Sequence, residues 1–329
     1  MVTIYKSQKV KIPNISFIKK LFTTTVGLGI DFGPFFLPGI TLLAYLTFSL
    51  SYNLFLLIYF SALFVSIFWL YILTVNFYNI KVTNYTLHNK KITMPVKIIY
   101  ISDIHIGYKW EETNKIRLNR IINKINKLDK DLILIGGDIL NHNYTPKLLE
   151  QFKNLNGTKI AVLGNHDNAH VITGYHTKET PINLINKLKE CGITVLINSG
   201  LSISKELFIG GIKDLYTLDF DVDNALLESK TNQYKVLLSH NPDIISYNSE
   251  LQDVDLVISG HNHGGQINIF GIHLPIPSLR QWLTHGVYNL DKHTKLILSS
   301  GIGVSGSRVR LGTKYEIVQI DLLPQNTTL

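Results

Sequence analysis

The segment Val96-Lys-Ile-Ile-Tyr-Ile-Ser-Asp103-Ile-His105 is an apolar, β-branched run that stops at an acid and a histidine. A short apolar run with polar boundaries predicts a buried strand. Four more segments repeat this pattern: Leu132-Ile-Leu-Ile-Gly-Gly-Asp138, Lys159-Ile-Ala-Val-Leu-Gly-Asn165-His166-Asp167, Val236-Leu-Leu-Ser-His240 and Leu256-Val-Ile-Ser-Gly-His261-Asn262-His263. Side chains at the carboxyl ends of neighbouring parallel strands converge on one crevice. The repeated pattern therefore predicts a shared ligand site.

Around these segments, β-branched runs alternate with polar helical stretches, which favours an α/β or mixed-sheet domain. Strands are expected at 96–101, 132–135, 159–163, 234–238, 255–258, 266–272, 295–298 and 315–320, and helices at 111–128, 146–155, 181–190 and 221–228. The single cysteine, Cys191, excludes an intramolecular disulfide framework and a cysteine-rich zinc module. The net charge of +8 fits anionic lipid, nucleic acid or phosphorylated substrates equally well.

Each strand-end motif has an ordinary structural explanation when it is taken alone. Gly-Asp after a strand is typical of a turn, Asn-His-Asp can cap a helix, and one histidine can be a hydrogen-bonded core residue. All five motifs at strand ends favour a metal centre. Its candidate ligands are Asp103, His105, Asp138, Asn165, His240, His261 and His263.

Oxygen and imidazole ligands without thiolate favour divalent manganese, iron or zinc in a reactive centre over a structural zinc site. Seven ligands are too many for one tetrahedral ion, but they suit two ions that share a bridging carboxylate. Two ions about 3.5–4 Å apart can hold a hydroxide and stabilise both the attacking and the leaving oxygen of a displacement. Hydrolysis of phosphate esters is the reaction that most needs such a centre.

An uncharged stretch precedes this domain. From Phe32 to Ile80 there is no Asp, Glu, Lys, Arg or His, and the charged fraction of the whole chain is only 17%. A membrane-spanning helix needs about 20 apolar residues, so we expect two spans, at 40–50 and 54–75. Aromatic residues near their ends suit an interfacial belt: Phe35, Phe36, Tyr71, Phe77 and Tyr78. Two buried helices of a soluble protein are the alternative, and a cleavable signal peptide is disfavoured by the length of the run.

Basic residues flank this stretch on both sides. They are Lys6, Lys9, Lys11, Lys19 and Lys20 before it, and Lys81, Lys90, Lys91 and Lys97 after it. With two spans, the positive-inside rule places both flanks and the catalytic domain on the cytoplasmic side of the cell membrane. If only the second run spans, the domain can face outward. The later lysines are either topology signals or contacts to anionic head groups.

Taken in order, the five motifs read Asp-x-His, Gly-Asp, Gly-Asn-His-Asp, His and Gly-His-x-His. In this signature the chain resembles the calcineurin-like metallophosphoesterase superfamily. The resemblance implies a two-sheet β-sandwich flanked by helices over residues 91–323, after a basic segment at 1–31 and the membrane hairpin at 32–80. It also implies two divalent metal ions, with manganese favoured and iron or zinc as alternatives.

The resemblance assigns a role to each motif residue. Asp103, His105 and His263 would bind one metal, Asn165, His240 and His261 the other, and Asp138 would bridge the two. His166 would stabilise the charge on the phosphoryl oxygens or protonate the leaving oxygen, with Asp167 orienting its ring.

Within the superfamily, the chain is most similar to the YkuE/YaeI-like group of membrane-associated phosphodiesterases. The similarity rests on the N-terminal membrane segment, Gly264-Gly-Gln266 after the last histidine, and the late segment Ser299-Ser-Gly-Ile-Gly-Val304 with Arg310. Some relatives cleave the pyrophosphate of UDP-diacylglucosamine in lipid A synthesis. After Asp138 the chain continues Ile139-Leu140-Asn141 and lacks the Arg of protein Ser/Thr phosphatases, which argues against that branch.

Three functions follow as alternatives. The first is a membrane-anchored phosphodiesterase or pyrophosphatase that attacks a lipid-linked substrate with a metal-bridging hydroxide. The second is the same chemistry on soluble nucleotides or nucleic acid, although no basic and aromatic stripe indicates a nucleic-acid partner. The third is a non-enzymatic scaffold, against which the non-ligand His166 argues.

Two further features carry open interpretations. The apolar stretch 270–283 either receives acyl chains or dips into the membrane interface, or else it is packed core. Arg310 either contacts a phosphate or forms a surface salt bridge. No residue pattern identifies the substrate head group, the substrate-binding residues or the oligomeric state.

Overall fold

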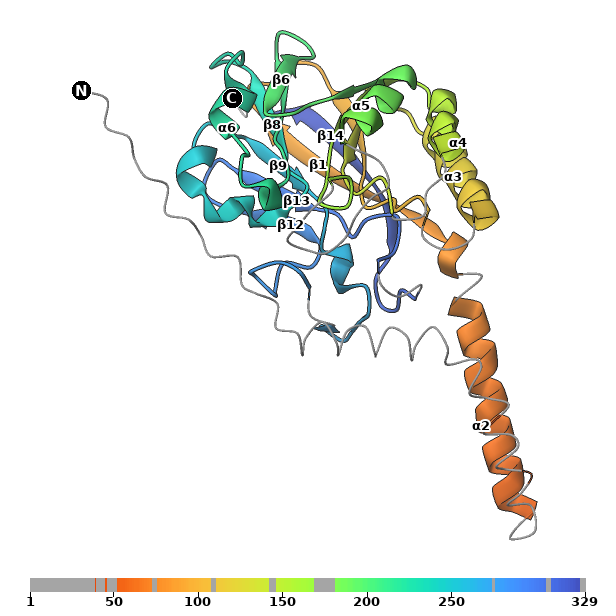
Figure 1. Cartoon of the computed structure of the whole chain (residues 1–329). Helices are drawn as coiled ribbons and strands as arrows, with labels where there is room; N and C mark the ends of the chain where they lie inside the picture. Colours follow the sequence, from red (N-terminus) through yellow and green to blue (C-terminus); the bar gives the residue numbers. More distant parts are fainter. Residues whose placement is uncertain are drawn as a thin grey trace.

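The structure is a computed structural model that describes residues 52–72, 76–107, 111–141, 146–168, 181–273, 276–305 and 309–325, with single helical positions at Gly39 and Tyr45. It consists of one long apolar helix that projects from a body built on two sheets (Figure 1). The first expected membrane span, at 40–50, and the basic segment at 1–31 lie outside the described residues apart from Tyr45.

The body contains two six-stranded sheets. In spatial order the first is β1 (Ile80–Asn89), β14 (Tyr315–Pro324), β2 (Val96–Ile101), β3 (Leu132–Gly136), β4 (Thr158–Val162) and β5 (Ile193–Val195). The second is β12 (Gly286–Asn289), β13 (Lys295–Leu298), β9 (Leu256–Ser259), β8 (Tyr234–Leu238), β7 (Leu207–Gly211) and β6 (Ser199–Ser202). Strands β2 to β5 are parallel to one another, and so are β7, β8, β9 and β13.

Alternating side chains of the central strands sort into separate cores. Ile98 and Tyr100 of β2 pack between the two sheets, together with Val236 and Leu238 of β8. The intervening Ile99 instead packs on the outer face of the first sheet. A strand that is covered on both faces needs apolar side chains at every position. The sequences of these strands are therefore continuous apolar runs, without the polar alternation of a half-exposed strand.

Helices cover both outer faces. The helices over the first sheet are α3 (Glu111–Asn126), α4 (Pro146–Leu149), η2 (Glu150–Asn154) and α5 (Pro181–Glu190), and those near the second are η3 (Leu215–Thr217), α6 (Val222–Leu226), η4 (Pro242–Ser246) and η5 (Asn248–Leu251). The remaining elements are η6 (His263–Gly265) and a small hairpin of β10 (Asn268–Ile269) and β11 (Ile272–His273). The expected two-sheet sandwich flanked by helices is confirmed.

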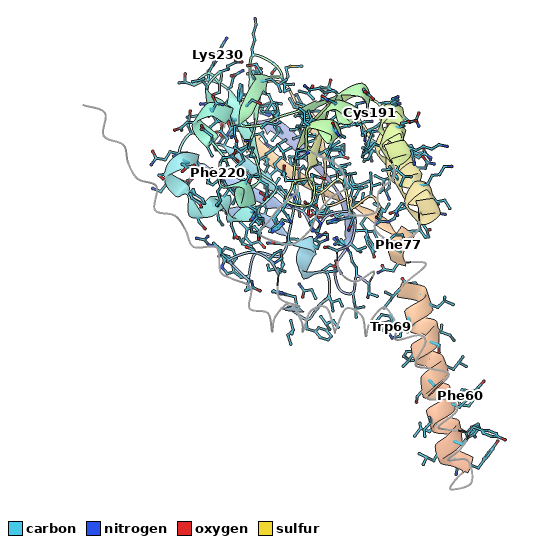
Figure 2. All side chains as sticks on the ribbon, viewed as in Figure 1. Phe60, Trp69, Phe77, Cys191, Phe220 and Lys230 are labelled. Carbon is cyan, nitrogen blue, oxygen red and sulfur yellow. The ribbon has the colours of Figure 1, made fainter. Side chains whose placement is uncertain are left out.

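The apolar helix α2 (Tyr52–Tyr71) has no charged residue and coincides with the second expected span. It is long and apolar enough to cross a membrane, and among the described residues it is the one helix with this property. At 1.5 Å per residue its 20 residues extend about 30 Å, the thickness of a bilayer's hydrocarbon core. Figure 2 shows Phe60 and Trp69 on this helix, away from the body.

Several expectations near the start of the domain differ from the structure. Strand β1 pairs along its whole length with β14, so the sheet begins at Ile80, before the expected boundary at 91. Phe77 packs on Tyr315, with ring centroids 5.7 Å apart, and the Arg120 guanidinium lies 4.4 Å from the Tyr78 ring centroid. These two aromatic rings therefore pack on the domain, because the chain enters the sheet only a few residues after α2.

Two of the lysines expected at head groups are held by the domain instead. Lys91 Nζ lies 2.8 Å from Asp255 Oδ2, and Lys97 Nζ lies 2.5 Å from Asp129 Oδ2. The strand expected at 266–272 is also wrong. Gln266, Phe270 and Gly271 have positive φ, so the extended backbone is interrupted at its start and turns back at Phe270-Gly271, which leaves only the short hairpin of β10 and β11.

Candidate metal centre

The five strand-end motifs meet at one edge of the sandwich. Strands β2, β3 and β4 are neighbours in the first sheet, and β8 and β9 are neighbours in the second. The expected ligands follow these strands by two to four residues and are buried. The parallel arrangement of each set brings their carboxyl ends together, as the sequence predicted.

The turns that carry the ligands are conformationally strained. Five non-glycine residues have positive φ: Asp103 (53°), His105 (51°), Asp138 (50°), His261 (74°) and His263 (51°). Each such residue costs about 1–3 kcal/mol, and clusters of them mark functional sites. Backbone bonds hold the turns, since Asp103 N–H donates to Gly137 O and His105 N–H to Asp138 O, both at 3.0 Å.

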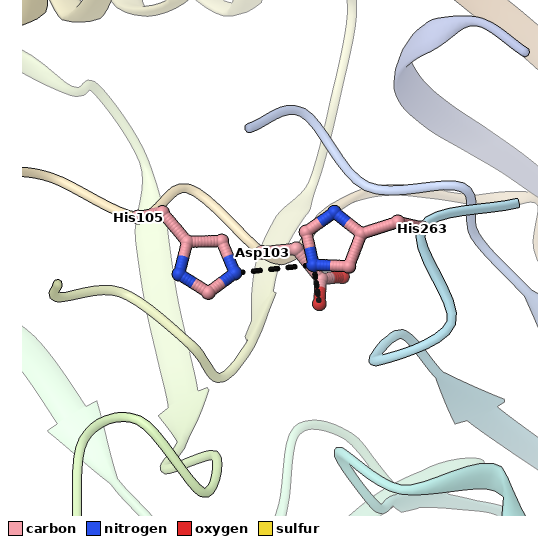
Figure 3. A group of neighbouring side chains, drawn as sticks. All are labelled: Asp103, His105 and His263. Carbon is pink, nitrogen blue, oxygen red and sulfur yellow. Dashed lines mark hydrogen bonds and ion pairs between the residues drawn. The ribbon is translucent and has the colours of Figure 1, made fainter. Parts of the chain in front are cut away.

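Asp103, His105 and His263 form the first ligand group (Figure 3). His105 Nε2 lies 3.1 Å from His263 Nε2, which in turn lies 3.5 Å from Asp103 Oδ1. The other carboxylate oxygen of Asp103 accepts a 2.6 Å hydrogen bond from the Ser102 hydroxyl. The three candidate ligand atoms therefore face one another from two different sheets.

Asp138, His240 and His261 form the second group. His240 Nε2 lies 3.1 Å from His261 Nδ1 and 3.3 Å from Asp138 Oδ2. His240 Nδ1 lies 2.8 Å from Gly136 O, which fixes the ring and leaves Nε2 toward the site.

Asp138 connects the two groups. Its Oδ2 also lies 3.6 Å from His105 Nε2, a member of the first group. Its Oδ1 accepts a 2.9 Å hydrogen bond from His166 N–H, which fixes the carboxylate. A single carboxylate oxygen thus faces one histidine of each group, the position that a bridging ligand requires.

The chemistry of these residues fits divalent metal ions. Asn165 Oδ1 and His261 Nε2 are buried polar atoms with no hydrogen-bond partner among the residues that the structure describes, which is costly unless they bind something else. Burial lowers the pKa of His105 and His263 well below the ordinary value, and it lowers the pKa of His261 to about 3, helped by the charge of His240. These three imidazoles are therefore uncharged at neutral pH, the form that binds a metal.

The carboxylates have contrasting environments. Burial raises the pKa of Asp103 to about 6. Burial acts in the same direction on Asp138, but the neighbouring His240 and His166 outweigh it and hold the pKa of Asp138 well below its usual range. Asp138 is thus the carboxylate that stays ionised even without metal.

His166 lies in the site, and Asp167 lies just behind it. A ring nitrogen of His166, a ring nitrogen of His105 and a carboxylate oxygen of Asp138 lie within 4.8 Å of one another. The His166 ring stands edge-on to the His105 ring, with centroids 4.7 Å apart. Asp167 accepts backbone bonds of 2.9 Å from Ile139, Leu140 and Gly164. Asp167 therefore ties the Asp138 turn to the Asn165 turn, and its orientation of the His166 ring stays a prediction.

Arg310 is fully buried beside the first group, so its assignment to a surface salt bridge is wrong. Its Nε and Nη2 donate to Gly303 O, its Nη1 donates to His263 O and Lys314 O, and its Nη2 lies 3.1 Å from His263 Nδ1. These five contacts match the five N–H groups of a guanidinium, so none is left for a phosphate. Arg310 instead holds the backbone and ring of His263.

Sequence analysis missed Asp214 and Tyr216 beside the second group. Asp214 is buried, its Oδ2 has no hydrogen-bond partner, and burial raises its pKa to about 6. The Tyr216 ring centroid lies 5.7 Å from that of His261. The signal was present, because Asp214 follows β7 (Leu207–Gly211) much as the candidate ligands follow their strands. The two glycines at the end of β7, Gly210 and Gly211, made that strand hard to recognise in the sequence.

Comparisons with known proteins agree with this geometry. A family model described as calcineurin-like phosphoesterase matches residues 96–265. An uncharacterized metallophosphoesterase of Campylobacter jejuni is 34% identical over 69% of this chain and 59% of its own length. One from Helicobacter pylori is 30% identical over 75% of this chain and 65% of its own length. The matched part thus spans about three fifths to two thirds of these curated relatives.

Two other similarities are to a protein named as transmembrane and to a solved structure. A zebrafish protein named transmembrane protein with metallophosphoesterase domain is 27% identical over 69% of this chain and 53% of its own length. Among solved structures, Haemophilus influenzae NAD nucleotidase is 16% identical over 70% of this chain and 48% of its own, with a TM-score of 0.38. This structural likeness is too low to inform function.

Proposed function

This chain belongs to the calcineurin-like phosphoesterase family of metal-dependent phosphoric ester hydrolases, and we propose that it cleaves a phosphodiester or pyrophosphate bond of a lipid-linked substrate at a membrane surface. The observation that carries the proposal is the position of Asp138 Oδ2, 3.6 Å from His105 Nε2 and 3.3 Å from His240 Nε2. One oxygen facing both ligand groups suits a two-metal hydrolytic centre.

Each ligand group would hold one divalent ion. The first ion would be held by Asp103, His105 and His263. The second ion would be held by Asn165, His240 and His261, and Asp138 would contact both ions. When bound, the ions supply positive charge to the phosphoryl group and lower the pKa of water, with manganese favoured. Five of the seven proposed ligands lie at strained backbone positions, and hydrogen bonds between the turns hold their main chains.

Of the remaining residues, His166 is the proposed proton donor to the leaving oxygen. Its backbone N–H donates to Asp138 Oδ1 at 2.9 Å, which holds its main chain beside the carboxylate that faces both groups. A positioned general acid contributes about 10²–10⁴ in rate.

Membrane anchoring is supported by α2. The helix buries only Ala62 in the described structure and has no charged residue, so its surface suits lipid better than water. We propose an arrangement with two spans and the domain on the cytoplasmic side, as the basic flanks predict. The relatives from zebrafish and cattle that are named transmembrane proteins add support for an anchor.

A lipid-linked substrate explains why a hydrolase would be anchored, because substrate and site then share the same surface. The test uses the full chain in liposomes with manganese and compares bis-p-nitrophenyl phosphate, p-nitrophenyl phosphate and UDP-diacylglucosamine. Fastest turnover of the lipid supports the proposal. Turnover of the soluble diester alone would keep the chemistry and favour a soluble nucleotide substrate. No turnover of any of them by protein with two bound metals would favour the scaffold function.

A further inference from the structure

The hairpin of β10 and β11 ends in a group of exposed apolar side chains, here called the apolar tip: Ile269, Phe270 and Ile272. Their exposed fractions are 43%, 100% and 80%. Ile269 and Ile272 are paired across the hairpin, so their side chains lie on the same face beside Phe270. We propose that the apolar tip inserts into the bilayer that holds α2, docking the metal centre at the lipid surface. This inference rests on the anchoring in the proposed function.

The conformation of the tip supports a role beyond closing a turn. Phe270 and Gly271 have φ of 53° and 84°, so both central residues of the two-residue loop are left-handed. Such loops favour Asn-Gly or Asp-Gly, and a bulky residue with positive φ is an outlier. A fully exposed phenylalanine at a strained position stabilises nothing in the described structure, which points to a partner outside the chain.

The hairpin is seated firmly on the metal centre. Asn268 N–H donates to Leu311 O at 2.8 Å, and Leu311 N–H donates to Gln266 O at 3.1 Å. A Cβ on Gly265 would lie 2.7 Å from the His273 Cβ, so β11 packs directly on the turn that carries His263. The apolar tip is therefore rigidly connected to a metal-ligand turn rather than being a loose loop.

The tip lies on the side of the domain that faces the membrane helix. The Asn76 side-chain amide, five residues after the end of α2, donates a 2.9 Å hydrogen bond to Arg310 O. Leu311, the next residue, pairs with the base of the hairpin. Five residues reach at most about 18 Å, so α2 must leave the bilayer close to this side.

Charge and composition favour lipid over a protein partner. From Gln266 to Leu290 the chain has no Asp or Glu, and it carries Arg280. Leu279 and Trp282 in the same stretch are 40% and 60% exposed. Tryptophan prefers the membrane interface, and an exposed stretch of chain without acidic residues is compatible with anionic head groups.

The test places a fluorescent label on the tip in the full chain. Phe270→Cys is labelled with an environment-sensitive dye and reconstituted in vesicles of phosphatidylcholine and phosphatidylglycerol. The native Cys191 is only 5% exposed, so the unsubstituted chain serves as the labelling blank. Leu227→Cys is the matched control, because Leu227 is an exposed leucine (75%) at the end of α6, away from α2 (Figure 1).

Insertion of about 5–10 Å predicts at least roughly threefold weaker quenching by aqueous iodide at position 270 than at 227, and stronger quenching by lipid-borne nitroxide. Equal iodide quenching at both positions would overturn the proposal. So would protection from iodide without nitroxide quenching, since that result would indicate a protein contact such as a second copy. Flotation of the vesicles tests anchoring separately: protein that fails to float contradicts the proposed function itself, whereas floating protein with an aqueous tip contradicts only this inference.

Discussion

Arg310 gives the sharpest test of how the first ligand group is held. Replacement by methionine, Arg310→Met, keeps a long apolar side chain and removes all five N–H groups. The buried carbonyls of Gly303 and His263 then lose their guanidinium donors. His263 O keeps the Gln266 N–H at 2.9 Å, so among the described residues Gly303 O is the carbonyl left unsatisfied. At about 1–3 kcal/mol for an unsatisfied carbonyl, the free energy of unfolding should fall by that amount.

The same change should weaken metal binding. Arg310 fixes both the backbone oxygen and Nδ1 of His263, so its loss frees the ring to rotate away from Asp103. Partners that orient a metal-binding histidine contribute about 10–100-fold in affinity. Calorimetric titration with Mn²⁺ on detergent-solubilised, metal-stripped protein, together with thermal unfolding, measures both effects.

The matched control is Arg120→Met, which removes an exposed guanidinium that lies over the Tyr78 ring. It should change neither the Mn²⁺ affinity nor the melting temperature appreciably. Wild-type Mn²⁺ affinity and melting temperature in Arg310→Met would refute the assignment of Arg310 as the residue that positions His263.

Three further predictions concern other parts of the site. His166→Gln should lower turnover of bis-p-nitrophenyl phosphate by about 10²–10⁴ with unchanged metal content; loss of a metal would make His166 a ligand instead. Gly303→Ala should lower the melting temperature, because the new Cβ would lie 2.2 Å from Asp103 O, and an unchanged temperature would contradict the close packing. In metal-stripped protein, burial raises the pKa of Asp214 from 3.8 to about 6, so the ionised form is disfavoured by folding. Wild-type stability should therefore fall as pH rises from 4 to 7, with Asp103 contributing in the same direction. In urea titrations the fall should be smaller in Asp214→Asn by up to about 3 kcal/mol, and parallel pH profiles for the two proteins would contradict this prediction.

The sequence predicted the centre of the fold well because both faces of the central strands are covered. Strands β2, β8 and β13 have the expected bounds, since their unbroken apolar runs end where the backbone turns. The short edge strands β5 and β6 were not predicted. Their residues are half-exposed and mix polar with apolar side chains, so no periodicity distinguishes them from loops.

The candidate ligands were predictable because their position depends on local sequence, a strand followed by a turn. The surrounding residues depend on contacts distant in the chain. Arg310 contacts His263, 47 positions away in the sequence. Its five contacts go to three backbone carbonyls and one ring nitrogen, and any sequence supplies backbone carbonyls. Burial of Arg310 without a carboxylate could not be predicted from the sequence, and neither could the pairing of Ile267, at the base of the hairpin, with Leu311.

The central claim is that Asp138 joins two metal-ligand groups into one hydrolytic centre. Its most direct test is manganese titration of bis-p-nitrophenyl phosphate hydrolysis by metal-stripped full chain, with metal counted in the same samples, for wild type and Asp138→Asn. The account predicts that turnover by the wild type requires two bound Mn²⁺ per chain. In Asp138→Asn it predicts that turnover is lost and that at least one of the two ions no longer binds. Undiminished turnover and two bound ions in Asp138→Asn would contradict it.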